Sequence, residues 1–108
     1  MKQTPTLKQW NELTVDQMAA FWHKIETEFI EDEWFHWMRL EKVKHFILHT
    51  TPNIGQMIQF LGDDLSDIQF TDVSVCLYGK MKRNRREMYF KNDELVDTLW
   101  LAVKHKLK

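Results

Sequence analysis

The spacing of hydrophobic residues changes twice along this chain, and this change constrains the fold more than any other feature of the sequence. From Leu13 to about residue 62, apolar residues recur at the three- to four-residue spacing of amphipathic helices. Between Ile68 and residue 90 they alternate with polar residues, as in half-buried strands. After Asn92 the helical spacing returns. The pattern predicts an α+β fold with three N-terminal helices, a short antiparallel β-hairpin or sheet and a C-terminal helix, in the order ααα-ββ-α.

The first two helices are predicted from a capping pattern and two apolar stripes. Thr14 followed by Gln17 is typical of a capping box, so the first helix should begin there. Its stripe comprises Val15, Met18, Trp22, Ile25 and Phe29. A cluster of acidic residues follows, and a second helical stretch then runs from Trp34 to about His49.

Capping residues also bound the third and last helices. Thr51 suits an N-cap, Pro52 suits the first helical position, and Gly62 suits the residue that ends a helix. The inner face of this third helix should carry Ile54, Met57, Ile58 and Leu61. Asn92 is the expected N-cap of the final helix, which has acidic residues at its start and lysines at its end, as the helix dipole favours.

The strands lie between these helices. The alternation slips at Thr71 and Asp72, which indicates either a bulge or two short strands. Residues 79–85 form a basic turn, and residues 87–90 supply the returning strand of a hairpin. Because an isolated hairpin is marginal in water, the strands should lie against the helices or pair with another strand. An exposed strand edge would allow a homo-oligomer or strand addition by a partner.

Composition bounds the class of protein. With 108 residues, 44% of them hydrophobic, and only three Gly and two Pro, the chain should form a packed core. We expect residues 1–12 to be a loose segment and residues 13–108 to form a single compact domain. The lone Cys76 and the absence of an apolar signal segment favour the cytoplasm. No apolar run is long enough to span a membrane.

Neither a catalytic nor a metal-binding motif stands out. Glu41, His45 and His49 have helical spacing that could present them to a divalent ion, but solvated or capping histidines are the simpler interpretation. Cys76 has no neighbouring base, and the dispersed glycines form no phosphate loop. Asp63, Asp64 and Asp67 miss the spacing of a calcium loop. The sequence therefore predicts a protein that is not an enzyme and needs no cofactor or metal.

Charge is distributed unevenly. Residues 1–79 carry six Lys or Arg against twelve Asp or Glu, whereas residues 80–108 carry nine against four. The densest basic segment, with Tyr78 and Tyr89 at its base, could contact a phosphate backbone or an exposed base. Its cations are Lys80, Lys82, Arg83, Arg85 and Arg86. The simpler alternative is a solvated loop that keeps a strand edge from aggregating.

A second candidate surface combines acidic and aromatic residues. Its members are Glu31, Asp32, Glu33, Trp34 and Trp37. A helix cannot turn all of the nearly consecutive residues 34–38 inward, so some aromatic side chains should reach the surface. Exposed tryptophans beside charged residues are typical of protein-binding hot spots, and an acidic face could also imitate phosphate.

Two segments carry a resemblance to known proteins. Residues 51–65 (TPNIGQMIQFLGDDL) and 94–107 (ELVDTLWLAVKHKL), together with the Trp-rich first half, resemble small proteins encoded by bacteriophages and prophages. This resemblance implies a phage accessory protein, a class that includes anti-CRISPR inhibitors of bacterial defence nucleases. The leading hypothesis is thus a small protein-binding accessory protein that inhibits a host protein. The alternatives are a nucleic-acid-binding accessory protein using loop 80–86 and a structural homo-oligomer.

Overall fold

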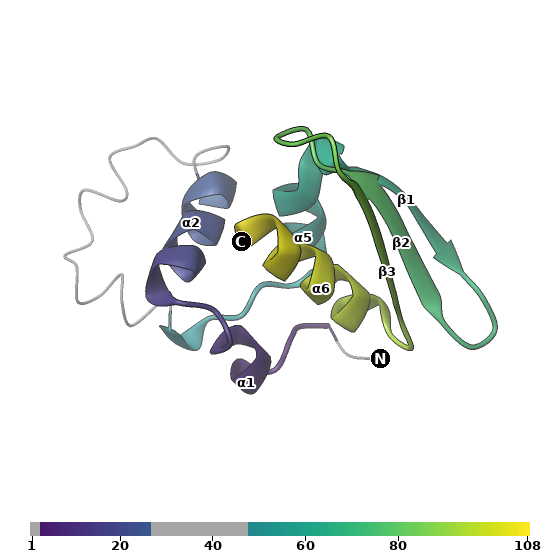
Figure 1. The fold of residues 1–108 in the computed structure, drawn as a ribbon. Helices are drawn as coiled ribbons and strands as arrows, with labels where there is room; N and C mark the ends of the chain where they lie inside the picture. The colour runs from purple at the N-terminus through teal and green to yellow at the C-terminus, as the bar shows by residue number, and fades with distance from the viewer. Residues whose placement is uncertain (1–2, 27–47) are drawn as a thin grey trace. The chain divides into compact units, whose positions relative to one another are not determined.

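The computed structural model describes residues 3–26 and 48–108. The chain divides into two compact units, one formed by Met1–Pro5 with Pro52–Lys108 and the other by Thr6–Thr51. Helices and an antiparallel sheet are both present, so the predicted α+β class and the rough helix-strand-helix order are confirmed (Figure 1). No helix in the described ranges is long and apolar enough to cross a membrane.

Helices α1 (Leu7–Trp10) and α2 (Val15–Glu26), in the described part of the Thr6–Thr51 unit, each begin with a closed capping box. Helix α1 lies within the segment expected to be loose and was not predicted; the Thr6 hydroxyl accepts a hydrogen bond from the Gln9 N–H at 3.1 Å. Helix α2 begins where predicted, because the Gln17 N–H donates to Thr14 Oγ1 at 3.2 Å and the Gln17 side chain accepts from the Thr14 N–H at 2.9 Å.

Aromatic rings are packed together and buried in the described part of this unit. Trp10, Phe21 and Trp22 meet edge to face, with ring centroids 5.2 to 6.1 Å apart. Met18 and Ile25 are also buried, as the α2 stripe predicted, but Val15 in the first turn is 41% exposed and does not join the core. Phe29 and nearly all of the predicted second helix lie outside the described residues.

In the other unit, helix α5 (Ile54–Leu61) starts later than predicted. Its N-cap is Asn53 rather than Thr51, and Pro52 is not its first helical residue. The reason is a capping box: Asn53 Oδ1 accepts from the Gln56 N–H at 2.8 Å, and Gln56 Oε1 accepts from the Asn53 N–H at 2.9 Å. Gly62 ends α5 as predicted, with a φ of +51° that favours glycine, and begins the 3₁₀ turn η1 (Gly62–Asp64).

The inner face of α5 also differs from the prediction. Met57 and Leu61 are fully buried as expected, but Phe60 is buried and Ile58 is 37% exposed. The stripe is therefore rotated by part of a turn from the predicted one, and the large Phe60 ring takes the core position expected for Ile58.

The sheet has three antiparallel strands in the order β1-β2-β3. They are β1 (Leu65–Phe70), β2 (Val75–Lys80) and β3 (Glu87–Asn92). The slip in alternation marks a turn between two strands, in which the Thr71 N–H donates to the Ser74 carbonyl at 2.9 Å. A separate irregularity interrupts the pairing of β1 with β2 between Leu65 and Asp67. The predicted hairpin is thus β2 with β3, and β1 adds a third strand.

Helix α6 (Leu95–Leu107) packs against β2, β3 and α5 (Figure 1). Its N-cap is Glu94, not the predicted Asn92, because Asn92 is still the last residue of β3 and pairs with Val75. Apolar side chains fill the space between these elements. They include Met57, Leu61, Leu77, Met88, Val96, Leu99, Trp100 and Val103. The core therefore lies on one face of the sheet.

Candidate nucleic-acid interface

The opposite face of the sheet carries a pair of exposed tyrosines. Tyr78 on β2 is the register partner of Tyr89 on β3, and their ring centroids are 5.1 Å apart at an interplanar angle of 49°. Tyr78 is 37% exposed and Tyr89 is 55% exposed. Alternation explains this placement, since the neighbouring Leu77 and Met88 are buried in the core. Two aromatic rings therefore face solvent side by side.

The next row of the same face is charged. Lys80 is the register partner of Glu87, and both are exposed. Strand alternation places them on the same side as the two tyrosines. The open face thus presents an aromatic row followed by a cation and a carboxylate.

Residues 81–86 connect β2 to β3 in a turn held by main-chain hydrogen bonds. The Met81 N–H donates to the Arg86 carbonyl at 2.8 Å, and the Arg85 N–H donates to the Met81 carbonyl at 2.7 Å. Met81 is buried and anchors the turn, while Arg85 has a φ of +59°, the left-handed conformation that closes it. The predicted basic loop is therefore a defined turn with its arginines at the surface.

The five cations of this segment fall into two groups. Lys82 forms an ion pair with Asp63 at 2.9 Å, and an Arg83 Nη atom donates to the Lys108 carbonyl at 3.0 Å. Among the described residues, the side chains of Lys80, Arg85 and Arg86 have no hydrogen bond or ion pair. These three cations are available to an anionic ligand.

The neighbouring Lys82 changes the pKa of the Asp63 carboxyl group. The hydrogen bond from Lys82, together with the charge of that ammonium group, holds the pKa of the exposed Asp63 carboxyl below its usual value. Asp63 therefore keeps its negative charge well into the acidic range, and the Lys82 charge remains locally neutralised.

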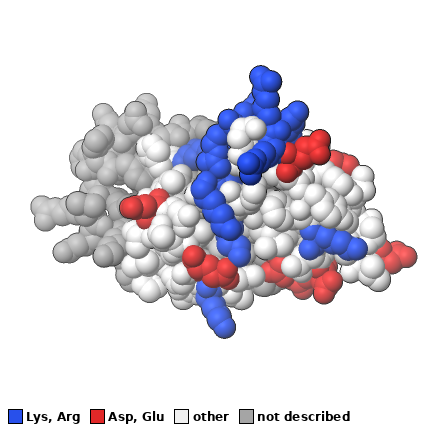
Figure 2. All heavy atoms as spheres, viewed as in Figure 1, with Lys and Arg blue, Asp and Glu red and all other residues white. Residues whose placement is uncertain are grey.

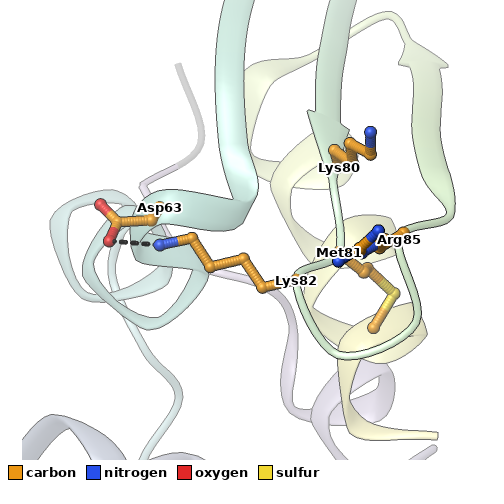
Figure 3. Close-up of a pocket in the computed structure, with 5 residues that line it drawn as sticks. All are labelled: Asp63, Lys80, Met81, Lys82 and Arg85. Carbon is orange, nitrogen blue, oxygen red and sulfur yellow. Dashed lines mark hydrogen bonds and ion pairs between the residues drawn. The ribbon is translucent and has the colours of Figure 1, made fainter.

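Two hollows lie next to the charged row. The loop hollow, about 400 Å³, is lined by Asp63, Lys80, Met81, Lys82 and Arg85. Figure 3 shows the Lys82 side chain reaching toward Asp63, while Lys80 points away from that ion pair. The tyrosine hollow, about 550 Å³, is lined by Ser66, Tyr78, Gly79, Lys80, Glu87, Met88 and Tyr89. Lys80 borders both hollows and connects the aromatic row to the basic turn.

A largely buried network fixes the base of the turn. Lys106 Nζ lies 3.1 Å from Asp64 Oδ2, and both side chains are mostly buried, 16% and 11% exposed. The same ammonium group donates to the carbonyls of Phe60 and Leu61 at 2.9 and 3.2 Å. The other Asp64 oxygen accepts from the Lys82 N–H at 3.2 Å. The end of α5, the start of the turn and α6 are thereby joined.

The basic turn belongs to a larger band of positive charge. Figure 2 shows Lys and Arg side chains gathered in a band that runs over the β2–β3 turn and the end of α6. The last turn of α6 contains Lys104 and Lys106, of which Lys106 is largely buried, and Lys108 follows the helix. This band coincides with the basic C-terminal quarter of the sequence.

Cys76 is a buried residue of β2 and alternates with Tyr78 on the same side of the strand. Its Sγ is 3.7 Å from the Tyr89 hydroxyl oxygen, and the residue is 7% exposed. This hydrogen bond, with a further contribution from desolvation, raises the pKa of Tyr89 above its usual value of 10.0. The Tyr89 ring is therefore neutral under all physiological conditions.

Of the other residues predicted to form sites, some lie outside the described ranges and some have observed contacts. Glu31, Asp32, Glu33, Trp34 and Trp37 lie outside the described residues, as do Glu41 and His45. In the acidic turn, Asp63 and Asp64 contact lysines, and Asp67 accepts from the Gln69 amide at 3.2 Å. The place of Glu87 beside the tyrosines was missed by sequence analysis. Its alternation with Tyr89 along β3 was the signal that could have found it.

We compared the chain with known proteins. No protein-family model, no curated protein and no solved structure matches it.

Proposed function

We propose that this protein binds single-stranded nucleic acid through the open face of its sheet. The observation that carries the proposal is the exposed Tyr78–Tyr89 pair beside three cations that have no hydrogen bond or ion pair in the described part of the chain. Single-strand-binding proteins combine these two features, aromatic platforms for the bases and cations along the backbone.

The arrangement suggests a division of roles. The tyrosine rings would stack against bases, which all offer a π face. Arg85 and Arg86 would contact phosphates on the side of the turn, with the loop hollow, which Arg85 lines, as one phosphate position. The basic turn alone is too narrow for the wider footprint of a duplex, and the formal net charge of the chain is −1. A single strand is therefore the better ligand.

The leading hypothesis from the sequence, a phage-type inhibitor that binds a host protein, remains a prediction. Its residues, 31–34 and 37, lie outside the described ranges, so no observed contact supports or opposes it. The homo-oligomer alternative also remains a prediction. It would use the β1 edge, where Phe70 is 66% exposed, and the turn that follows it, where Val73 is 78% exposed.

The tyrosine pair provides the first test. Replacing Tyr78 and Tyr89 together with Ala should weaken binding of a fluorescein-labelled U₁₂ RNA by on the order of 30-fold or more, since each stacked base contributes about 1–3 kcal/mol. The Y78F/Y89F variant keeps both rings and should bind within about threefold of the wild type. Fluorescence anisotropy measures both affinities. Equal affinity of the Ala and Phe variants would exclude stacking as the basis of binding.

The two groups of cations provide a matched second test. K80Q/R85Q and K82Q/R83Q each remove one Lys and one Arg from segment 80–86, but only the first pair has no hydrogen bond or ion pair to another described residue. K80Q/R85Q should reduce the magnitude of the slope of log K against log salt concentration by about 0.7, because it removes the phosphate contact of Arg85 and single strands give about 0.7 per phosphate contact. K82Q/R83Q should change the slope much less. Equal changes would show that only overall charge matters. A wild-type protein that binds neither RNA nor DNA single strands would refute the proposed function.

A further inference from the structure

The tyrosine hollow has a polar end that stacking does not explain. Its aromatic part consists of Tyr78 and Tyr89, but Ser66, Lys80 and Glu87 also line it. Lys80 and Glu87 pair across the strands in the row next to the tyrosines. A base stacked on the rings would therefore direct one edge toward an ammonium group and a carboxylate.

A carboxylate is an unexpected group on a surface that binds phosphates. Glu87 is exposed, and within the described residues its side chain has no hydrogen bond or ion pair, so it is not committed to fold stability. It would repel a phosphate at this position, whereas an ionised carboxylate accepts hydrogen bonds at both oxygens. It therefore suits a ligand edge that carries two adjacent donors.

Among the four RNA bases, the Watson–Crick edge of guanine fits this requirement. Its N1–H and N2 amino group are adjacent donors that match two carboxylate oxygens, and its O6 acceptor matches a lysine ammonium group. Adenine and cytosine offer only an amino group beside an unprotonated ring nitrogen. Uracil offers one N–H between two carbonyl oxygens, which a carboxylate would repel. Single-stranded bases are generally read by hydrogen bonds on such edges.

We propose that the tyrosine hollow selects guanine in a single strand, with Glu87 reading N1–H and the N2 amino group and Lys80 reading O6. This inference rests on the proposed function and adds base selectivity to it. Stacking then supplies affinity that is independent of sequence, and the Lys80–Glu87 row supplies the preference.

The experiment uses the full chain and four labelled 11-nucleotide RNAs that are all uridine except for G, A, C or U at the central position. Anisotropy should show the G-containing strand binding about tenfold more tightly than the U-only strand, as expected for a good bidentate pair. A strand with inosine at the centre lacks only the N2 amino group and should lose most of this advantage. E87Q should lose it as well, because the amide offers one acceptor. The control E94Q makes the same change at the exposed start of α6 and should retain it.

The outcomes separate this inference from the function on which it rests. If the wild type binds all four strands equally, guanine selection is wrong while single-strand binding stands. If E87Q tightens binding to every strand by the same factor, Glu87 acts only as a repelling charge and the inference is also wrong. If no strand binds, both proposals fail. An inosine strand that binds as tightly as the guanine strand would contradict the assigned hydrogen bonds even without a variant protein.

Discussion

The substitution Gly79→Ala should lower the free energy of unfolding by about 3 kcal/mol, because it forces a side chain into a closely packed position. A Cβ at this residue would overlap the backbone carbonyl oxygen of Asp64 and lie 2.9 Å from Met88 Cε. The methionine end can move, but Asp64 belongs to the 3₁₀ turn η1 and its side chain is fixed by Lys106. The strain must therefore separate β2 from η1. Thermal unfolding followed by circular dichroism should show a midpoint lower by about 15 °C.

Gly55→Ala is the matched control for this prediction. Gly55 lies in α5, where the nearest atom to an added Cβ is Asn53 Oδ1 at an ordinary contact distance of 3.4 Å. Alanine is favoured over glycine within a helix by about 1 kcal/mol, so this variant should be equally or more stable than the wild type. If Gly79→Ala unfolds at the wild-type temperature, the close approach of β2 to η1 is wrong.

Lys106→Met should also destabilise the protein strongly, by about 3 kcal/mol, because removing one partner of a largely buried ion pair leaves the other uncompensated. Methionine preserves most of the side-chain length but removes the ammonium group. Asp64 then loses its ion pair, and the carbonyls of Phe60 and Leu61 at the end of α5 lose a donor. Urea unfolding at neutral pH measures the loss.

A double-mutant cycle makes this second prediction specific. In D64N/K106M neither charge remains, so the double variant should be less destabilised than the sum of the D64N and K106M effects. Lys108→Met makes the same chemical change at an exposed residue just beyond α6 and should alter stability by no more than about 0.5 kcal/mol. Additive effects of D64N and K106M would show that the two side chains do not interact.

Local signals in the sequence were sufficient for several elements. The Thr14–Gln17 capping box and the end of α5 at Gly62 are confirmed, because both depend on residues within one or two turns. The N-caps of α5 and α6 were placed wrongly. Asn53 forms a closed box with Gln56, and Asn92 is retained by β3 because it pairs with Val75 across the sheet. Pairing between strands overrides a capping preference that is worth only about 1 kcal/mol.

In the candidate interface, too, some features could be predicted from local sequence and others depend on contacts between residues far apart in the chain. The cluster of cations and the two tyrosines were visible in the sequence, since they are adjacent to one predicted hairpin. The sequence could not show that Lys82 and Arg83 have protein partners while the side chains of Lys80, Arg85 and Arg86 have none among residues 3–26 and 48–108. That difference depends on Asp63 and Lys108, which are 19 and 25 residues away along the chain.

The amino-acid sequence by itself determined the α+β class, the positions of most helices and strands, and the basic character of the β2–β3 turn. These follow from hydrophobic period and local charge, which act over a few residues. Only the tertiary structure decided that Glu87 stands beside Lys80 and the tyrosine pair, and that Lys106 supports the turn by binding Asp64. Strand register and packing bring these residues together, and both depend on burying one face of the sheet beneath α6 while leaving the other open to solvent.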